Sequence, residues 1–302
     1  RKHLLDGANE LRIDFQPASA VGFERRKAYF ESEKLPETTA CFEERPFVRK
    51  AQYMYGWDWG PRLVSCGIWK NVSIVDFSNR ILGVQAVTSQ ADGWVLTLKT
   101  EVEGKKGLRI VHTLTGDDID ELLIEGDGEY EIEGVEQWDT YNPVLYTLTT
   151  ELWDGDHLED FVETSIGFRT IELVRKPDEF GESFQFVLNG EPIWARGANW
   201  IPNHSFPSIA DQGTPARLAD AVEMGMNMVR VWGGGLYESE EFYDACDRLG
   251  LLVWQDFAYG CSYYPDGPKE QEIAEKEALA NIKRLRNHPS LALWCGNNEN
   301  LT

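Results

Sequence analysis

A short stretch near the end of the chain, residues 288–300, joins an apolar run to a polar ending. The run LALWC is typical of a buried strand, and it is followed by Asn297, Asn298, Glu299 and Asn300. Buried strands more often end in turn residues such as Gly, Asp or Pro, so this cluster of amides and a carboxyl indicates a site. A carboxyl can donate or accept a proton, and a neighbouring amide can hold a hydroxyl group. We therefore expect acid/base chemistry at Glu299.

Other apolar strands also end in residues that could bind or react. Asn199, Trp232 and Asp256 each follow an apolar run and precede a loop. In a barrel of parallel strands such ends converge on one mouth, where these enzymes place their chemistry. A carboxylate at a strand end can instead cap the next helix or pair with an arginine, and this alternative stays open for Glu299. Burial near tryptophans such as Trp294 would favour the protonated carboxyl of Glu299.

The segment that contains these strand ends alternates strands with helices. The pair Asn189-Gly190 predicts a hairpin turn. Beyond it, the helical patterns lie at 214–224, 239–249 and 269–286, each followed by an apolar strand. Repeated β-α units with short links imply a parallel sheet.

The earlier part of the chain consists mainly of strand patterns. Residues 1–78 alternate around one charged helical stretch at 23–35, and the closing run GIWKNVSIVDF predicts a buried face that includes Ile68 and Ile74. We expect part of a β-sandwich there. Residues 79–170 are a series of short strands divided by turn signals, which predicts a second, immunoglobulin-like sandwich.

Composition narrows the classes of partner. The 302 residues include 51 acidic and 29 basic side chains, and the net charge of −22 would repel nucleic acid and anionic membranes, so a neutral substrate fits better. The cysteines number 5, too few and odd for a disulfide framework. The cysteines and histidines lack metal-ligand spacing, and the glycines after Trp232 match no nucleotide-binding pattern. We expect neither a metal nor a cofactor.

Several motifs together resemble the β-mannosidases of glycoside hydrolase family 2. They are YMYGWDWGPRLVSCGIWKNV, NPVLYTL, IGFRTIEL, NGEPIWARGANWIP, GMNMVRVWGGGLYE, LLVWQDF and NHPSLALWCGNNE, which span nearly the whole chain. WDWGP and RVWGGG resemble the β-mannosidase branch, whereas the Asn-Glu strand end is shared with galactosidases and glucuronidases. The resemblance implies a multidomain β plus α/β fold. Its parts would be a jelly-roll-like β-sandwich (1–78, lacking its start), an immunoglobulin-like β-sandwich (79–170) and the first half of a (β/α)8 TIM barrel (171–302).

The resemblance also implies a reaction and a division of roles. The family hydrolyses glycosides with retention, using an acid/base carboxyl and a nucleophilic carboxyl about 5 to 5.5 Å apart. By motif match, Glu299 is the acid/base, and Asn298 holds the sugar 2-hydroxyl, which is axial in mannose. The nucleophile of such enzymes lies on a later barrel strand, so we expect it outside this chain.

A second set of residues is expected to line the terminal-sugar subsite. Trp57 and Asp58 belong to a loop that reaches over the barrel mouth in β-mannosidases, although Trp57 could instead pack between domains. Trp232 would form a wall of the same pocket. Arg230 would point inward, because side chains alternate along a strand, or it would pair with a barrel carboxylate.

Asp256 and Asn199 are expected to support this site indirectly. Asp256 could position Glu299 or Arg230 by a hydrogen bond, or it could cap the loop that follows. Asn199, at the end of the first barrel strand, is a weaker candidate for the same kind of role.

The resulting expectation is an exo-acting β-mannosidase that removes terminal β-mannose from short oligosaccharides or simple β-mannosides. One alternative is another family 2 exoglycosidase, such as a β-glucosaminidase. A second is a non-catalytic carbohydrate-binding protein. A homodimer is one assembly that the sequence leaves open, and the acidic balance with sparse cysteines favours the bacterial cytoplasm or periplasm.

Overall fold

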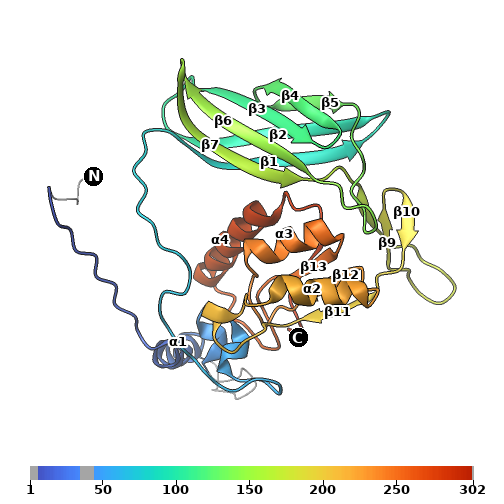
Figure 1. Cartoon of the computed structure of the whole chain (residues 1–302). Helices are drawn as coiled ribbons and strands as arrows, with labels where there is room; N and C mark the ends of the chain where they lie inside the picture. The colour runs from blue at the N-terminus through green and yellow to red at the C-terminus, as the bar shows by residue number, and fades with distance from the viewer. Residues whose placement is uncertain (1–5, 35–43, 301–302) are drawn as a thin grey trace.

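The computed structural model describes residues 6–34 and 44–300. In Figure 1 a layered β-structure lies above a smaller parallel sheet covered by helices, and the N-terminal segment runs along the side of both. None of the helices in the described residues combines the length and the apolar content needed to cross a bilayer.

Residues 80–166 form two antiparallel sheets packed face to face (Figure 1). One sheet has the order β1-β2-β5, with β1 Arg80–Gln90, β2 Trp94–Glu103 and β5 Gly128–Ile132. The other has the order β4-β3-β6-β7, with β4 Ile119–Glu125, β3 Arg109–Gly116, β6 Tyr146–Asp154 and β7 His157–Ile166. Alternate residues of these strands face inward, and Leu96, Leu114 and Leu148 meet in one buried core. The short strands predicted for this range are therefore present.

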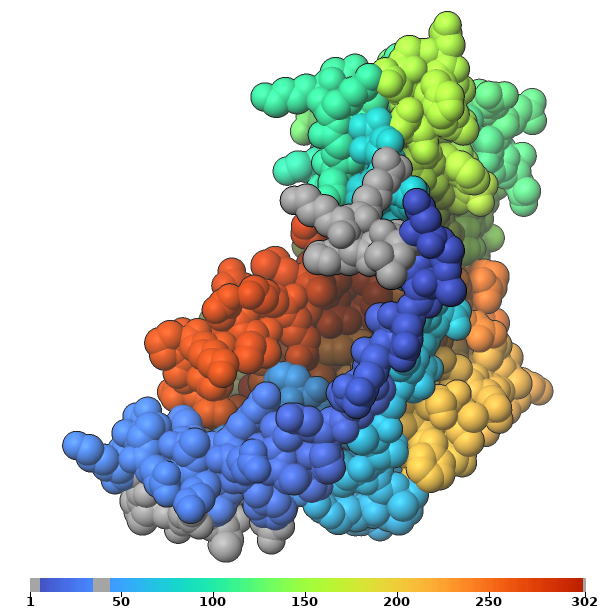
Figure 2. All heavy atoms as spheres, turned by 90° about the vertical axis from the view of Figure 1, so that its left-hand side faces the viewer, coloured from blue at the N-terminus to red at the C-terminus, as the bar shows by residue number. Residues whose placement is uncertain are grey.

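The described residues before 79 form helices and extended segments. They contain α1 Ala18–Ser32, η1 Arg45–Phe47 and η2 Gln52–Tyr55. The charged helical stretch predicted at 23–35 is confirmed as α1, which begins earlier than expected. Figure 2 shows residues 6–17 as an extended arm on the outside of the molecule.

The buried strand face predicted between Ile68 and Ile74 is not formed in this structure. Ile68, Val72 and Ile74 are exposed by 57%, 60% and 77%, and this stretch pairs with no strand of the described residues. A lone strand leaves its backbone groups and its apolar face without partners, so an alternating pattern alone is insufficient to form one.

The last part of the chain contains a parallel sheet in the order β11-β12-β13-β14. Its strands are β11 Gly197–Trp200, β12 Met228–Val231, β13 Leu252–Asp256 and β14 Leu291–Cys295. The connecting helices are α2 Thr214–Glu223, α3 Glu240–Leu249 and α4 Pro268–Leu285, as predicted to within one residue. A small sheet precedes them, made of β8 Ile171–Val174, β9 Gln185–Leu188 and β10 Glu191–Ile193, and η3 Pro207–Ile209 follows β11.

The two faces of the parallel sheet are covered differently. On one face, Val229, Val231 and Val253 pack in the buried core that α3 supplies with Phe242 and Tyr243. The other face has its own, smaller core with the small sheet. Since side chains alternate along β12 and β13, Arg230 and Trp254 fall on this second face, away from the helices.

A polar joint fixes the sandwich to the segment that leads into β14. Asn287 continues the hydrogen bonding of β1, because its Oδ1 accepts from Ala86 N at 3.0 Å and its Nδ2 donates to Val84 O at 2.9 Å. Arg169 donates to the carbonyls of Pro289 and Leu291 at 2.9 and 2.7 Å. The joint therefore sets the start of the strand that carries Asn298 and Glu299 at its end.

Candidate active site

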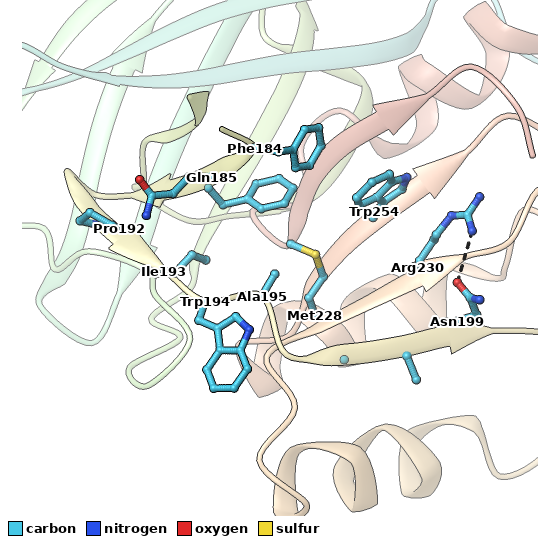
Figure 3. A pocket seen from close by; sticks show the side chains of 13 residues that line it. Phe184, Gln185, Pro192, Ile193, Trp194, Ala195, Asn199, Met228, Arg230 and Trp254 are labelled. Atoms are coloured by element: carbon cyan, nitrogen blue, oxygen red, sulfur yellow. Dashed lines mark hydrogen bonds between the residues drawn. The ribbon is translucent and has the colours of Figure 1, made fainter. Parts of the chain in front are cut away.

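The carboxyl ends of the parallel strands bring several predicted residues together. Arg230 Nη2 lies 2.6 Å from Asp256 Oδ2 and 2.9 Å from Asn298 Oδ1. Its Nη1 lies 3.4 Å from Asn199 Oδ1, the contact drawn in Figure 3. The guanidinium of β12 thus touches residues that follow or end the three other strands of the sheet. Parallel strands place their carboxyl ends on one edge, which is why these side chains meet.

Asp256 is the most enclosed member of this group. Its side chain is fully buried, and its two oxygens accept from Arg230, from the backbone N–H of Gly233 at 3.0 Å and from the Trp254 indole at 3.1 Å. A buried carboxylate requires such donors, because an unpaired charge would be costly in this environment. Of the contacts considered for Asp256, the one with Arg230 is present in the structure.

Asn298 and Glu299 are held by the loop that follows β13. This loop and the end of β14 continue to pair beyond the strands: Cys261 N donates to Asn298 O at 2.7 Å, and Asn298 N donates to Tyr259 O at 2.8 Å. The Cys261 thiol lies 3.0 Å from Glu299 Oε2. Burial, with the hydrogen bond and charge of Glu299, raises the pKa of that thiol to about 11.

The expected burial of Glu299 among tryptophans is wrong for this structure. Glu299 is exposed, and the Trp294 ring stacks on Phe257 at 5.0 Å as part of the core under the helices. Strand alternation turns Trp294 to the helix-covered face, whereas Glu299 lies past the end of β14. The apolar surroundings expected around Glu299 are therefore absent from the described residues.

Residues 57–60 of the N-terminal segment, here called the tryptophan loop, reach this edge of the sheet. Tyr53 N donates to Gly234 O at 2.9 Å, in the loop after β12. The Trp57 and Trp232 rings meet edge to face at 4.8 Å, and Trp59 lies 6.0 Å from Trp232. The structure thus brings Trp57 and Trp232 together.

Asp58 also belongs to the tryptophan loop. It lies at the exposed tip of a tight turn in which Trp57 and Gly60 pair with each other. Its place in the turn brings it near the tryptophans along the chain, but no contact between its carboxylate and Arg230 or Glu299 occurs in the described residues.

Two functional candidates were missed in the sequence. Arg45 is buried, donates to Gly260 O at 3.3 Å and to Cys261 O at 2.9 Å, and lies 4.9 Å over the Trp57 ring. Burial lowers the pKa of its guanidinium. The other is Cys261, which touches both Asn298 and Glu299. Neither residue belongs to a regular spacing, so no pattern in the sequence pointed to them.

A broad hollow lies along the face of the parallel sheet that is turned away from the helices, with a volume of about 850 Å³. Figure 3 shows Trp254, Met228 and Arg230 along the strands, with Phe184 and Trp194 at the side of the small sheet. Trp194 is 80% exposed and Phe184 is 53% exposed. The aromatic surface of this face is therefore open to solvent in the described residues.

A second polar cluster lies away from this edge. Asp244, Asp247 and His288 have ligand atoms close enough to hold a metal ion. These groups already bond to the chain, because His288 Nδ1 lies 2.6 Å from Asp247 Oδ2 and Ser290 N donates to Asp247 Oδ1 at 3.0 Å. The cluster therefore fastens the start of β14 to α3.

Comparison with known families gives two matches. Residues 1–70 match the family described as "Glycosyl hydrolase 2 galactose-binding domain-like", and residues 80–169 match "Glycosyl hydrolases family 2". Together the two ranges span more than half of the chain.

Similar proteins extend these matches to the remaining residues. The "Beta-mannosidase B" of Emericella nidulans is 36% identical over 315 residues, which cover 98% of this chain and 37% of that protein. That of Aspergillus terreus is 36% identical, with 97% and 36% covered. The crystal structure of a β-D-mannosidase from Dictyoglomus thermophilum aligns with a TM-score of 0.82 at 38% identity, covering 90% of this chain and 36% of that one. A Parabacteroides merdae β-glucuronidase shares the fold, with a TM-score of 0.61 at 22% identity.

The chain thus spans about 37% of the length of the first of these relatives. The first family match contains the tryptophan loop, and the second contains the sandwich of residues 80–166. The relatives align from the N-terminal segment to the parallel sheet. On these grounds the chain belongs to glycoside hydrolase family 2.

Proposed function

We propose that this chain is a segment of a retaining exo-β-mannosidase, which releases terminal, non-reducing β-D-mannose from β-mannosides. One observation carries the proposal: Trp57, Trp232, Arg230, Asn298 and Glu299 lie around a single edge of the parallel sheet although they come from distant parts of the chain. The resemblance to β-mannosidases from Emericella nidulans and Dictyoglomus thermophilum supports the sugar.

The proposed architecture has three parts. Residues 1–78 would belong to a jelly-roll-like sandwich, residues 79–170 would form an immunoglobulin-like sandwich, and residues 171–302 would supply the first half of a (β/α)8 barrel. The last point is supported by four parallel strands in sequential order, with helices on one face and an open aromatic face on the other. The missing strands of a barrel would cover that open face.

In the proposed reaction Glu299 is the general acid. A second carboxylate, which we place outside these 302 residues, attacks C1 of the mannose as the bond from C1 to the glycosidic oxygen breaks. The electron pair of that bond passes to the oxygen, which takes the proton of Glu299. Glu299 then removes a proton from water, which attacks C1 and displaces the second carboxylate, so the released mannose keeps its β configuration.

The remaining residues would bind the terminal mannose. Arg230 donates to Asn298 Oδ1 and so fixes the amide, whose oxygen has a further lone pair for the axial 2-hydroxyl. Asp256 holds Arg230 in turn. Trp57 and Trp232 offer an aromatic wall, and Asp58, at the tip of its turn, would accept hydrogen bonds from other hydroxyls.

The test uses the full-length protein that contains this chain and compares nitrophenyl β-mannoside with nitrophenyl β-glucosaminide. We expect clear preference for the mannoside, and ¹H NMR of the first product should detect β-mannose before mutarotation. Glu299→Gln should lower kcat/KM on a mannobiose by about 10² to 10⁴. Glu275→Gln, an exposed carboxyl change on α4, is the control and should have no effect.

Other outcomes favour the alternatives. Preference for the glucosaminide identifies another family 2 exoglycosidase, and binding of mannosides without turnover identifies a carbohydrate-binding protein. A homodimer stays a prediction, which light scattering of the purified full-length protein tests.

A further inference from the structure

The Cys261 thiol connects both residues of the Asn-Glu pair at the end of β14. Its sulfur accepts a hydrogen bond from Asn298 Nδ2 at 3.2 Å and lies 3.0 Å from Glu299 Oε2. With its pKa raised to about 11, the thiol is protonated at neutral pH and acts as the donor toward Glu299. One side chain thus contacts the amide and the carboxyl that the proposed reaction uses together.

The backbone on both sides of this contact is held in an unusual conformation. Cys261 has φ 49° and Glu299 has φ 51°, values in the left-handed region that L residues other than glycine rarely adopt. The short pairing between Gly260 and Asn298 maintains this geometry. Such strain persists only where the surrounding contacts impose it. The contacts between the two loops therefore impose the approach of Cys261 to Glu299.

The N-terminal segment also holds the loop after β13 that contains Cys261, here called the Cys261 loop. The buried guanidinium of Arg45 donates to the carbonyls of Gly260 and Cys261. Four residues later Arg49 donates to Ala258 O at 2.8 Å. Arg45 also lies over the Trp57 ring, so the same guanidinium touches the tryptophan loop and the Cys261 loop.

We propose that Cys261 is a positioning residue for the Glu299 carboxyl and that Arg45 fixes Cys261 in place. The inference rests on the acid/base role proposed for Glu299. A thiol bonded to Oε2 leaves Oε1 as the oxygen that carries the proton toward the leaving group. Without the thiol, the Glu299 side chain is free to turn at its exposed position, and proton transfer loses its fixed geometry.

The experiment exploits the dependence of acid catalysis on the leaving group. A dinitrophenolate leaves without protonation, whereas the sugar of β-1,4-mannobiose needs a proton from the acid. In the full-length protein, Cys261→Ala should lower kcat/KM for mannobiose by about 10- to 100-fold and leave that for 2,4-dinitrophenyl β-mannoside within about twofold. Cys261→Ser, which restores a donor, should recover most of the loss. Arg45→Met should show the same selective loss as Cys261→Ala.

Cys66→Ala is the matched control, because Cys66 is an exposed cysteine of the same protein, and it should change neither rate. The dinitrophenyl substrate reports whether each variant is folded. An equal loss on both substrates would give Cys261 a merely structural role, and no loss on mannobiose would make the thiol dispensable; either result overturns the inference while the mannosidase proposal stands. A wild-type protein that hydrolyses neither mannoside, or a Glu299→Gln variant that keeps full mannobiose activity, overturns both proposals.

Discussion

Arg230 and Asp256 form a two-point ion pair at the centre of the candidate site. Arg230 Nε lies 3.1 Å from Asp256 Oδ1, and Nη2 lies 2.6 Å from Oδ2. Asp256 is wholly buried, whereas the side chain of Arg230 is 26% exposed. The buried carboxylate therefore needs the ion pair to offset its lost hydration, whereas the guanidinium still reaches solvent. Through Arg230, this buried charge also determines the position of Asn298.

Removal of the carboxylate should both destabilise the protein and misplace Asn298. Asp256→Ala leaves Arg230, the Trp254 indole and the Gly233 amide without their common acceptor. We expect the free energy of unfolding to fall by about 2 to 3 kcal/mol in urea titration, less than for a fully buried pair because Arg230 reaches solvent. The control Asn199→Ala removes only the 3.4 Å contact at an exposed position and should stay within about 0.5 kcal/mol. Equal stability of the two variants would contradict this account.

His288 should make stability depend on pH in the alkaline range. Burial alone would lower the pKa of its imidazole, but hydrogen bonds to Asp247 and Glu240 outweigh burial and raise the pKa to about 9. The unfolded chain has a histidine pKa of about 6.5. The contribution of protonated His288 to the free energy of unfolding is therefore complete below about pH 6.5, and it is lost as the pH rises through about 9. The shift corresponds to roughly 3 kcal/mol.

Urea unfolding of wild type and His288→Gln between pH 6 and 10 measures this contribution. The wild-type protein should lose stability across the window, and the variant should lose clearly less. His157→Gln is the control, because His157 is 76% exposed. Burial lowers the pKa of His112, the opposite direction to the shift of His288. Parallel curves for wild type and His288→Gln would remove His288 as the cause.

Trp57 should matter for binding more than for turnover. Its ring meets Trp232 edge to face and lies under the Arg45 guanidinium, so the proposed contact of Trp57 with the sugar is combined with a packing role. In the full-length protein, Trp57→Ala should raise KM for aryl β-mannosides by about tenfold, which corresponds to about 1.4 kcal/mol of lost contact. Trp153→Ala, a change in β6 of the sandwich, should leave KM unchanged. A fall in kcat with unaltered KM would argue against a role of Trp57 in the subsite.

The parts of the fold that follow local rules could be predicted from the sequence. The helices between the parallel strands end within one residue of expectation because their apolar spacing and terminal Gly or Pro residues are local signals. The hairpin at Asn189-Gly190 forms with φ of 51° and 82°, the left-handed pair that this dipeptide favours. The meeting of Arg230, Asp256 and Asn298 follows from the parallel sheet alone.

The features that depend on distant contacts could not be predicted. Arg45 and Cys261 are 216 residues apart, and the local sequence around either residue does not indicate a contact with the other. The strand pattern around Ile74 could not reveal whether a partner strand lies beside it. Likewise the exposure of Glu299 depends on what stands opposite the open face of the sheet, which local sequence does not specify.

The 302-residue chain by itself should be inactive and prone to association. β11 and β14 are the outer strands of the described parallel sheet, and the face that carries Trp254 is open beside the exposed Trp194. Unpaired strand edges and exposed aromatic surfaces favour self-association, which light scattering over a concentration series detects. Without the second carboxylate the covalent route is closed, so turnover of an aryl β-mannoside should fall far below that of the full-length protein. Turnover within about a hundredfold of full length, abolished by Glu299→Gln, would show that the second carboxylate is dispensable and that the proposed mechanism is wrong.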